Sequence, residues 1–174
     1  MANLAPELVL AGRLVRLRPV VSADHAGLEA ILGEPSVARG WAAPSDAGAA
    51  ADWLSDDGAL HFVIEHDGVV VGSIQVEEEL EPDYRFASID LFLTTEAQGR
   101  GLGPDAIRTV AHYLLDMCSH HRLTIDPAVA NQSAIRAYTK VGFRPVGVMR
   151  AYERSADGTW HDNLLMDLLV GELT

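Results

Sequence analysis

The sequence predicts a mixed α/β domain because of three features. Residues 88–94 form an apolar run with the length and aromatic content of a buried strand, and an amphipathic helix follows almost at once. Residues 61–76 contain two Val- and Ile-rich arms around an Asp-Gly pair, which is typical of a tight β-hairpin. Residues 121–126 form another strand, and a capped helix follows. We therefore expect a largely antiparallel front half and a parallel pair of strands around the central helix.

The first third of the chain predicts one strand and two helices. Residues 8–18 alternate apolar residues with arginines, which indicates a single amphipathic strand. Ser22 caps a helix expected over residues 23–32. Residues 35–46 read as irregular, and residues 48–54 as a short alanine-rich helix. The 61–76 hairpin follows.

The turn after the central strand, residues 98–103 (QGRGLG), is rich in glycine. Three alternate glycines let the backbone approach a ligand, and unpaired amides at a helix start favour an anion such as a pyrophosphate. We expect Gly103 at the cap of the next helix and Pro104 at its first position. A P-loop would require Lys and then Ser or Thr after the last glycine, and a Rossmann turn would open the first strand and helix. The turn therefore fits neither class.

The last third predicts a helix between strands. Asn131 is expected to cap the helix that follows the 121–126 strand, and Gly142 to end it. Two final strands, residues 143–154 and 159–170, are joined by a four-residue turn.

Composition excludes several classes of protein. The 174 residues predict a single domain over residues 1–174. Thirteen Lys and Arg against 25 Asp and Glu give a net charge of -12, which argues against nucleic acid as a partner and would attract a polycation. The sequence shows neither a signal peptide nor an apolar run long enough for a bilayer, so we expect a cytoplasmic protein without a membrane partner. Seven scattered histidines suggest no metal site. A monomer and a homodimer both remain open.

Two segments resemble signatures of the GNAT acyltransferase superfamily. Residues 98–103 resemble its coenzyme A turn, and residues 131–143 closely resemble its N-x-x-A-x-x-x-Y-x-x-x-G-F pattern. The resemblance implies a mixed, mostly antiparallel sheet flanked by helices, with a V-shaped splay between its fourth and fifth strands, here residues 88–94 and 121–126. It also implies acetyl-CoA as cofactor. The cofactor contacts that it implies are Phe92, Leu93, Gln98, Gly99, Arg100, Gly101, Leu102, Gly103, Asn131, Ala134 and Tyr138.

Direct acetyl transfer to an amine in a ternary complex requires a neutral amine, stabilisation of an oxyanion and a proton for the departing thiolate. Tyr138, on a helix expected to face the cleft, is the candidate proton donor. Asp90 lies in an otherwise apolar strand, where an unpaired charge would be costly. We interpret Asp90 as a general base or amine-orienting anion, acting directly or through water. A structural ion pair is the alternative.

The acceptor side resembles the aminoglycoside 6'-N-acetyltransferases, which confer antibiotic resistance. The shared features are an aromatic residue in the early loop, a Gln on the third strand, an acidic loop, an Asp in the central strand and an Asp-Pro pair. A small cationic amine would be held by several carboxylates. The substrate contacts that this implies are Trp41, Gln75, Glu77, Glu79, Asp90 and Asp126.

Three alternatives remain open. The opening RLVRLRP and the overall layout also resemble acetylases of protein amino termini, including ribosomal-protein enzymes. Residues 126–143 resemble acetylases of hydroxylamines in siderophore assembly, although the central strand lacks the histidine expected of those. A non-catalytic acetyl-CoA sensor would need neither Asp90 nor Tyr138.

Overall fold

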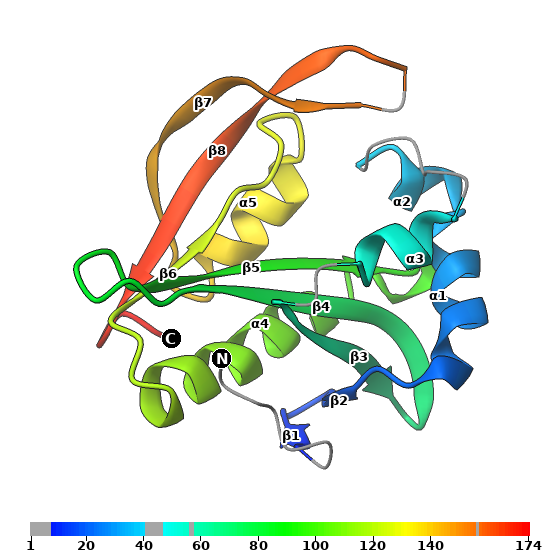
Figure 1. The fold of residues 1–174 in the computed structure, drawn as a ribbon, viewed down its shortest axis with the longest axis horizontal. Coiled ribbons are helices and arrows are strands. Elements are labelled where there is room, and N and C mark those ends of the chain that lie inside the picture. The colour runs from blue at the N-terminus through cyan, green and yellow to red at the C-terminus, as the bar shows by residue number, and fades with distance from the viewer. Residues whose placement is uncertain (1–7, 41–46, 56–57, 156) are drawn as a thin grey trace.

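The computed structural model describes residues 8–40, 47–55, 58–155 and 157–174. Its eight-stranded sheet has the order β1-β2-β3-β4-β5-β6-β8-β7 (Figure 1). Strands β5 and β6 run parallel, and the other neighbouring pairs of the described sheet run antiparallel. The strands are β1 (Leu10–Ala11), β2 (Arg16–Pro19), β3 (Leu60–His66), β4 (Val69–Glu79), β5 (Phe86–Leu93), β6 (Arg122–Ile125), β7 (Arg144–Arg154) and β8 (Trp160–Leu169).

Helices cover both faces of the sheet (Figure 1). The α-helices are α1 (His25–Leu32), α2 (Pro35–Ala38), α3 (Ala49–Trp53), α4 (Leu102–His112) and α5 (Gln132–Thr139). Short 3-10 turns span Ser22–Asp24 and Thr95–Ala97, and a π-helical turn, Tyr113–Met117, extends α4. No helix among the described residues is both long and apolar enough to cross a bilayer.

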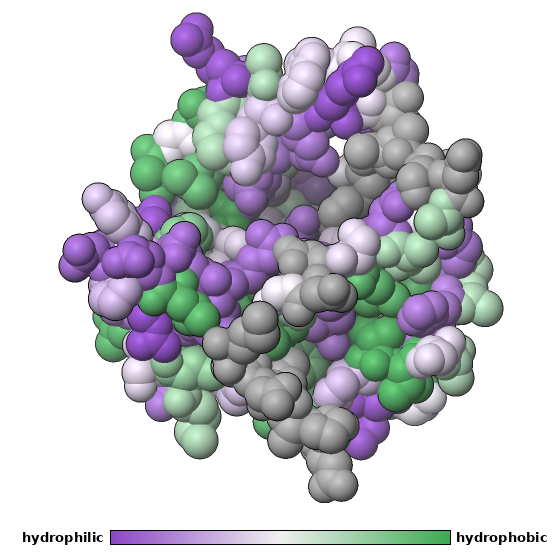
Figure 2. All heavy atoms as spheres, viewed as in Figure 1, coloured by the Kyte–Doolittle hydropathy of each residue, from purple (hydrophilic) through white to green (hydrophobic). Residues whose placement is uncertain are grey.

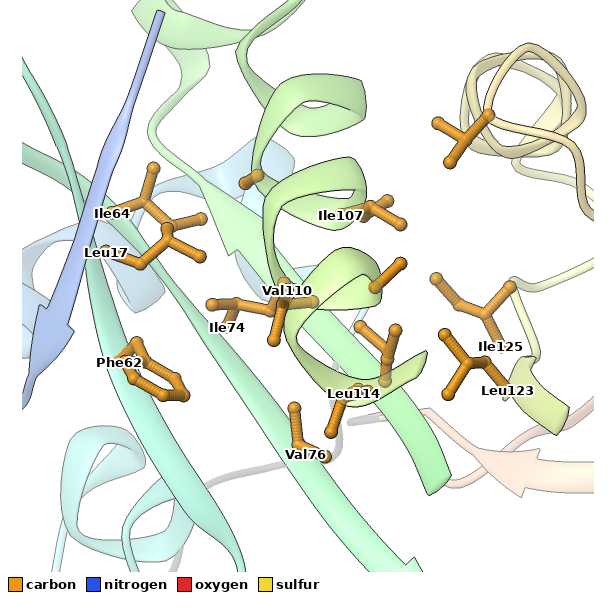
Figure 3. Close-up of a cluster of buried hydrophobic side chains, with 14 of the residues drawn as sticks. Leu17, Phe62, Ile64, Ile74, Val76, Ile107, Val110, Leu114, Leu123 and Ile125 are labelled. Atoms are coloured by element: carbon orange, nitrogen blue, oxygen red, sulfur yellow. The ribbon is translucent and has the colours of Figure 1, made fainter. Parts of the chain in front are cut away.

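The larger apolar cluster lies between the sheet and α4. Figure 3 shows side chains of β2, β3, β4 and β6 directed toward α4, which contributes Ile107 and Val110, and toward Leu114 of the π-helical turn that follows it. On the opposite face, α1, α2 and α3 build a second cluster, in which the rings of Trp53 and Phe92 meet edge to face at a centroid distance of 5.0 Å. Burial on both faces makes the sheet the middle layer of the fold.

Strands β5 and β6 diverge after a short paired segment. Among the described residues they pair at two positions, Ala87 with Leu123 and Ser88 with Thr124. Strand β5 nevertheless continues to Leu93. This divergence confirms the predicted V-shaped splay, because β5 and β6 are the strands predicted as fourth and fifth.

The predicted single strand over residues 8–18 is wrong, since the segment forms two short strands. A turn reverses the chain between them, with the Gly12 amide donating to the Val15 carbonyl at 2.8 Å. The buried Asp105 carboxylate of α4 accepts hydrogen bonds from the amides of Leu14 at 2.7 Å and Val15 at 3.1 Å. The apolar alternation of this segment does not reveal a turn held by a residue 90 positions away.

Three helix predictions also differ from the structure. Ser22, predicted to cap the first helix, lies in a 3-10 turn, and α1 begins at His25 after Asp24. Helix α4 begins at Leu102, one residue before the predicted cap Gly103, because Gly101 takes the cap position with φ 83°. Helix α2 forms inside the segment predicted as irregular, where Pro35 occupies the first turn. The predicted hairpin turn at Asp67 and Gly68 is confirmed, with φ values of 51° and 79°.

Gly72→Ala is expected to lower the free energy of unfolding by about 2–3 kcal/mol. A Cβ at Gly72 would lie 2.1 Å from the Phe92 carbonyl oxygen and 3.0 Å from the Leu93 Cα, so β4 and β5 would have to separate. Urea unfolding measures the change. Gly27→Ala in α1 is the control, because its Cβ would meet no atom within 4 Å and helix propensity favours alanine. Equal unfolding midpoints for the two variants would contradict the prediction.

Candidate active site

Asp90 and Asp126 occupy matching positions on the two diverging strands. Each lies two residues beyond the last paired row, in which Ser88 faces Thr124. Side chains alternate between the faces of a strand, so both carboxylates lie on the same side of the sheet, beside the splay. Gln75 on β4 pairs with Asp90 in the register and lies on this side too.

Strand β4 adds an amide and a carboxylate to this group. Gln75 Nε2 donates to Glu77 Oε1 at 2.7 Å. Glu79 follows on the same side, but its Oε1 accepts a hydrogen bond from the Glu81 amide at 2.8 Å. The structure therefore places Gln75 and Glu77 beside the acidic group, and bonds Glu79 within the loop after β4.

The middle glutamate of the acidic run points to the opposite face. Glu78 Oε1 lies 2.6 Å from Nε2 of His120, and the His120 side chain is fully buried. His120 precedes β6. Alternation along β4 thus separates Glu78 from its neighbours Glu77 and Glu79.

The pKa of Asp90 is strongly raised. Desolvation is the largest cause and the charge of Asp126 the next, with smaller contributions from Glu153 and Glu77, and together they raise the pKa of Asp90 from 3.8 to about 8. A hydrogen bond from the Leu91 amide to Asp90 Oδ1 at 2.9 Å opposes this shift. Asp90 is exposed to solvent. Exposure and desolvation coexist because the carboxyl opens into a recess with protein around it.

Sequence analysis missed two residues beside this group, Glu153 on β7 and Asn163 on β8. Asn163 is 3% exposed. Its Nδ2 donates to the Asp126 carbonyl at 2.8 Å, to Asp126 Oδ2 at 3.3 Å and to Glu153 Oε2 at 3.0 Å. The sequence signal for Asn163 is an amide side chain at the start of the apolar run of β8. For Glu153 the sequence gives no signal, because the irregular register of β7 directs this residue toward the acidic group.

Tyr138 approaches the splay from the other side of the sheet. Helix α5 packs against the larger apolar cluster through Tyr138 and Ile135. Desolvation is the largest cause that raises the pKa of the Tyr138 hydroxyl, and the charges of Asp90 and Asp126 add to it. The hydroxyl therefore stays protonated at neutral pH and lies within the electrostatic influence of both carboxylates.

The glycine-rich turn forms the other edge of the splay. Gly99 and Gly101 have positive φ values, 71° and 83°, which glycine adopts without strain. Gln98 Nε2 donates to the Leu93 carbonyl at 3.0 Å and closes the turn. The first intrahelical bond of α4 runs to the Gly101 carbonyl at 3.2 Å, so the amides before it are directed toward the turn. This geometry fits an anion such as a pyrophosphate.

Three further predicted positions take part in the turn and in α4. Leu102 is 2% exposed in the larger cluster, so its side chain serves the core. Arg100 donates from Nη2 to Nε2 of His66 at 3.3 Å, while Nδ1 of His66 lies 2.8 Å from the Leu14 carbonyl. Gly103 leaves its backbone open beside Leu93, whose Cδ1 lies 3.5 Å from an added Cβ.

Asn131 caps α5 as predicted. Its Oδ1 accepts from the Ala134 amide at 3.1 Å and from Ser133 Oγ at 2.8 Å. Phe92, another predicted cofactor contact, packs its side chain with Trp53 in the second apolar cluster. Trp41, a predicted substrate contact, lies outside the described residues.

Figure 2 shows the molecule hollowed between the β7–β8 hairpin and the body of the sheet, with hydrophilic side chains gathered around the hollow. Asp90 opens to solvent, and Asp126 and Glu153 reach the same acidic group. The arrangement can hold a cation, accept a proton at a carboxylate of raised pKa and donate one from a neutral tyrosine.

Curated proteins share parts of this sequence. Spermidine N(1)-acetyltransferase of Escherichia coli (strain K12) is 27% identical over 139 residues, which cover 76% of this chain and 74% of that protein. Aminoglycoside N(6')-acetyltransferase type 1 of Klebsiella pneumoniae is 35% identical over 74 residues, covering 42% of this chain and 36% of that enzyme. The chain thus spans between 36% and 74% of the length of such relatives.

The fold has solved counterparts. Mycobacterium smegmatis RimJ in complex with CoA-disulfide superposes with a TM-score of 0.82 and 26% identity, covering 97% of this chain and 90% of that one. The family model of the acetyltransferase (GNAT) domain matches residues 14–144. That match spans well over half of the chain, which therefore belongs to the GNAT acetyltransferases.

Proposed function

We propose that this protein transfers the acetyl group of acetyl-CoA directly to the 6'-amino group of an aminoglycoside, which is a polycationic acceptor. The observation that carries the proposal is the acidic group at the splay. Desolvation is the largest cause that raises the pKa of Asp90 on β5 to about 8, and the carboxylates of Asp126 after β6, Glu153 on β7 and Glu77 on β4 add to it. A group of like charges is costly unless a cation binds among them.

Acetyl-CoA is the acyl donor, and when bound it supplies an acetyl thioester. The positive-φ glycines and the first amides of α4 are suited to its pyrophosphate. Leu93 and Asn131 border the splay, where the pantetheine would lie. RimJ of M. smegmatis, whose structure contains CoA-disulfide, shares this fold over 97% of the chain.

Two side chains perform the proton transfers in this proposal. Asp90 takes the proton of the bound ammonium, directly or through water, and a carboxylate with pKa about 8 is matched to that task near neutral pH. Tyr138, whose pKa is raised, holds its proton until the thiolate departs. Asp90 lies on β5 of the sheet and Tyr138 on α5, which packs against the larger apolar cluster, and the charge of Asp90 acts on the Tyr138 hydroxyl.

The remaining carboxylates orient the acceptor. Glu77 is bonded to Gln75, and Asp126 and Glu153 are bonded to Asn163, so three of the carboxylates have defined positions. An acceptor with several ammonium groups would interact with more than one of them. Similarity to aminoglycoside N(6')-acetyltransferase type 1 of K. pneumoniae supports this acceptor class.

The test is thiol release from acetyl-CoA with kanamycin, tobramycin, spermidine and a ribosomal-protein amino-terminal peptide as separate acceptors. We expect turnover with both aminoglycosides, with kcat/KM at least about tenfold above that for the peptide, because each additional ion pair in a desolvated site adds on the order of 1 kcal/mol. Kanamycin modified at the 6' position should not react. Turnover with the peptide alone would contradict the aminoglycoside proposal.

Acetylation of a protein amino terminus is the second candidate, because the opening RLVRLRP and the overall layout resemble acetylases of protein amino termini. A single amino-terminal ammonium would interact with Asp90 and leave Asp126 and Glu153 without a cation. The acidic group therefore favours the polycation, and the peptide in the same panel distinguishes the two candidates.

A further inference from the structure

We propose that Asn163 is a positioning residue for acceptor recognition, because its amide holds the Asp126 and Glu153 carboxylates side by side at the cleft. The inference rests on the proposed function, since it concerns how that acceptor is bound. Asn163 itself would not touch the acceptor. It would act through the two carboxylates.

The hydrogen bonds define one orientation of the Asn163 amide. Nδ2 faces three oxygens, the carbonyl of Asp126, Oδ2 of Asp126 and Oε2 of Glu153, at 2.8, 3.3 and 3.0 Å. Oδ1 faces Nδ1 of His161 at 3.2 Å. Since carbonyl and carboxylate oxygens accept hydrogen bonds, only the NH2 end of the amide can face the three oxygens of Asp126 and Glu153. The two protons of one nitrogen thus serve oxygens from two separate strands.

The neighbouring strand is shaped so that Glu153 reaches this amide. The register between β7 and β8 shifts between Met149 and Glu153. Within this bulge Ala151 has φ 47°, and its amide donates to Asp162 Oδ1 at 2.8 Å. A bulge redirects the side chains that follow it. Asp162 therefore holds the bulge, and its neighbour Asn163 on β8 holds the Glu153 carboxylate that follows the bulge.

The electrostatics explain why a donor is needed between the carboxylates. Desolvation is the main cause that raises the pKa of Asp126, the charges of Glu153 and Glu77 add to it, and the Asn163 hydrogen bond lowers it. The other titratable groups of this cluster are Asp90 on β5, Tyr138 on α5, Tyr152 on β7 and His161 on β8, whose Nδ1 faces Oδ1 of Asn163. Without the amide, Asp126 and Glu153 would separate or one would take up a proton, and either change weakens cation binding.

Two variants with the same number of side-chain heavy atoms as asparagine isolate the donor. Asn163→Leu removes it at every pH, whereas Asn163→Asp supplies a donor only while its own carboxyl is protonated. With kanamycin as acceptor, we expect Asn163→Leu to raise the acceptor KM roughly tenfold, as loss of one buried charge-assisted hydrogen bond predicts, and to leave the KM for acetyl-CoA unchanged. We therefore compare the two variants by the ratio of their kcat/KM values, Asn163→Asp over Asn163→Leu, in which pH effects common to both cancel. This ratio should rise as pH falls from 8.5 to 6, because the introduced carboxyl becomes protonated and can donate.

Asp167→Asn is the matched control. It lies on the same strand and ion-pairs with Arg122 at 3.0 Å, away from the acidic group, so its acceptor KM should equal that of the wild type. An unchanged acceptor KM in Asn163→Leu would overturn the inference. So would equal rises in both KM values together with a lower Tm, because that pattern indicates a merely structural role.

A second measurement does not depend on turnover. The 13C titration of the Asp126 carboxyl should show a higher midpoint in Asn163→Leu than in the wild type, since the amide that lowers this pKa is gone. An identical midpoint would overturn the inference even if the acceptor is correct. Failure of the wild type to acetylate any aminoglycoside would instead overturn the proposed function, and the titration would still decide the role of Asn163.

Discussion

Asp90→Asn is expected to lower kcat/KM for the acceptor by roughly 100- to 10,000-fold, the range that a general base contributes. The substitution keeps the size of the side chain and its acceptor oxygen for the Leu91 amide, but removes the group that takes the ammonium proton. Steady-state thiol release with kanamycin measures the loss. Asp116→Asn, an exposed carboxylate on the π-helical turn, is the control and should retain wild-type kinetics.

The pH profile separates a base from an orienting anion. The free enzyme contains Asp90 with a pKa of about 8, so wild-type kcat/KM should fall as pH decreases below about 8 and Asp90 becomes protonated. In Asp90→Asn only the ionisation of the acceptor amine should remain in the profile. A variant profile with the wild-type midpoint would contradict the assignment of Asp90 as base.

Stability should change in the opposite direction to activity. Folding raises the pKa of Asp90 from 3.8, so the folded protein favours the protonated form and ionisation costs stability as pH rises from about 4 to about 8. Asp90→Asn should therefore raise Tm at pH 8, by roughly 2–4 °C for about 1 kcal/mol, a value discounted because the carboxyl is open to solvent. Below pH 4 the difference should disappear. A lower Tm at pH 8 would instead indicate that Asp90 is a structural ion-pair partner.

Local patterns predicted much of the fold because short-range rules dominate there. The Asp67-Gly68 turn follows from residues that tolerate positive φ, and the Asn131 cap from an amide side chain that replaces a missing intrahelical acceptor. Asp90 and Asp126 were identified as polar residues next to apolar strands. Their common face follows from period-two alternation once the parallel register of β5 and β6 is known.

Long-range contacts account for what the sequence did not predict. The turn between β1 and β2 depends on Asp105, a residue of α4 whose carboxylate accepts from two amides of that turn. Glu153 joins the acidic group because of the bulge at Ala151, a residue type that rarely has positive φ. At the β1–β2 turn and at the Ala151 bulge, the local sequence pattern indicates a regular strand. A tertiary hydrogen bond offsets that local preference for strand.

Tyr138→Phe is expected to lower kcat roughly 100-fold while leaving both KM values within about twofold of wild type, because the hydroxyl acts on the departing thiolate and not on either bound reactant. The raised pKa keeps the hydroxyl protonated over the whole working range, so a proton is present when the thiolate departs. Single-turnover acetylation of kanamycin measures the chemical step without product release.

The size of the Tyr138→Phe effect also distinguishes an enzyme from an acetyl-CoA sensor. Phenylalanine preserves the ring that packs against the larger apolar cluster, so acetyl-CoA affinity and Tm should stay close to wild type. Calorimetric titration with acetyl-CoA provides that control. A variant with unchanged single-turnover rate would remove Tyr138 from the mechanism and assign protonation of the thiolate to water. Loss of acetyl-CoA binding would place the hydroxyl in the cofactor site, where it would hold the thioester before any chemistry occurs.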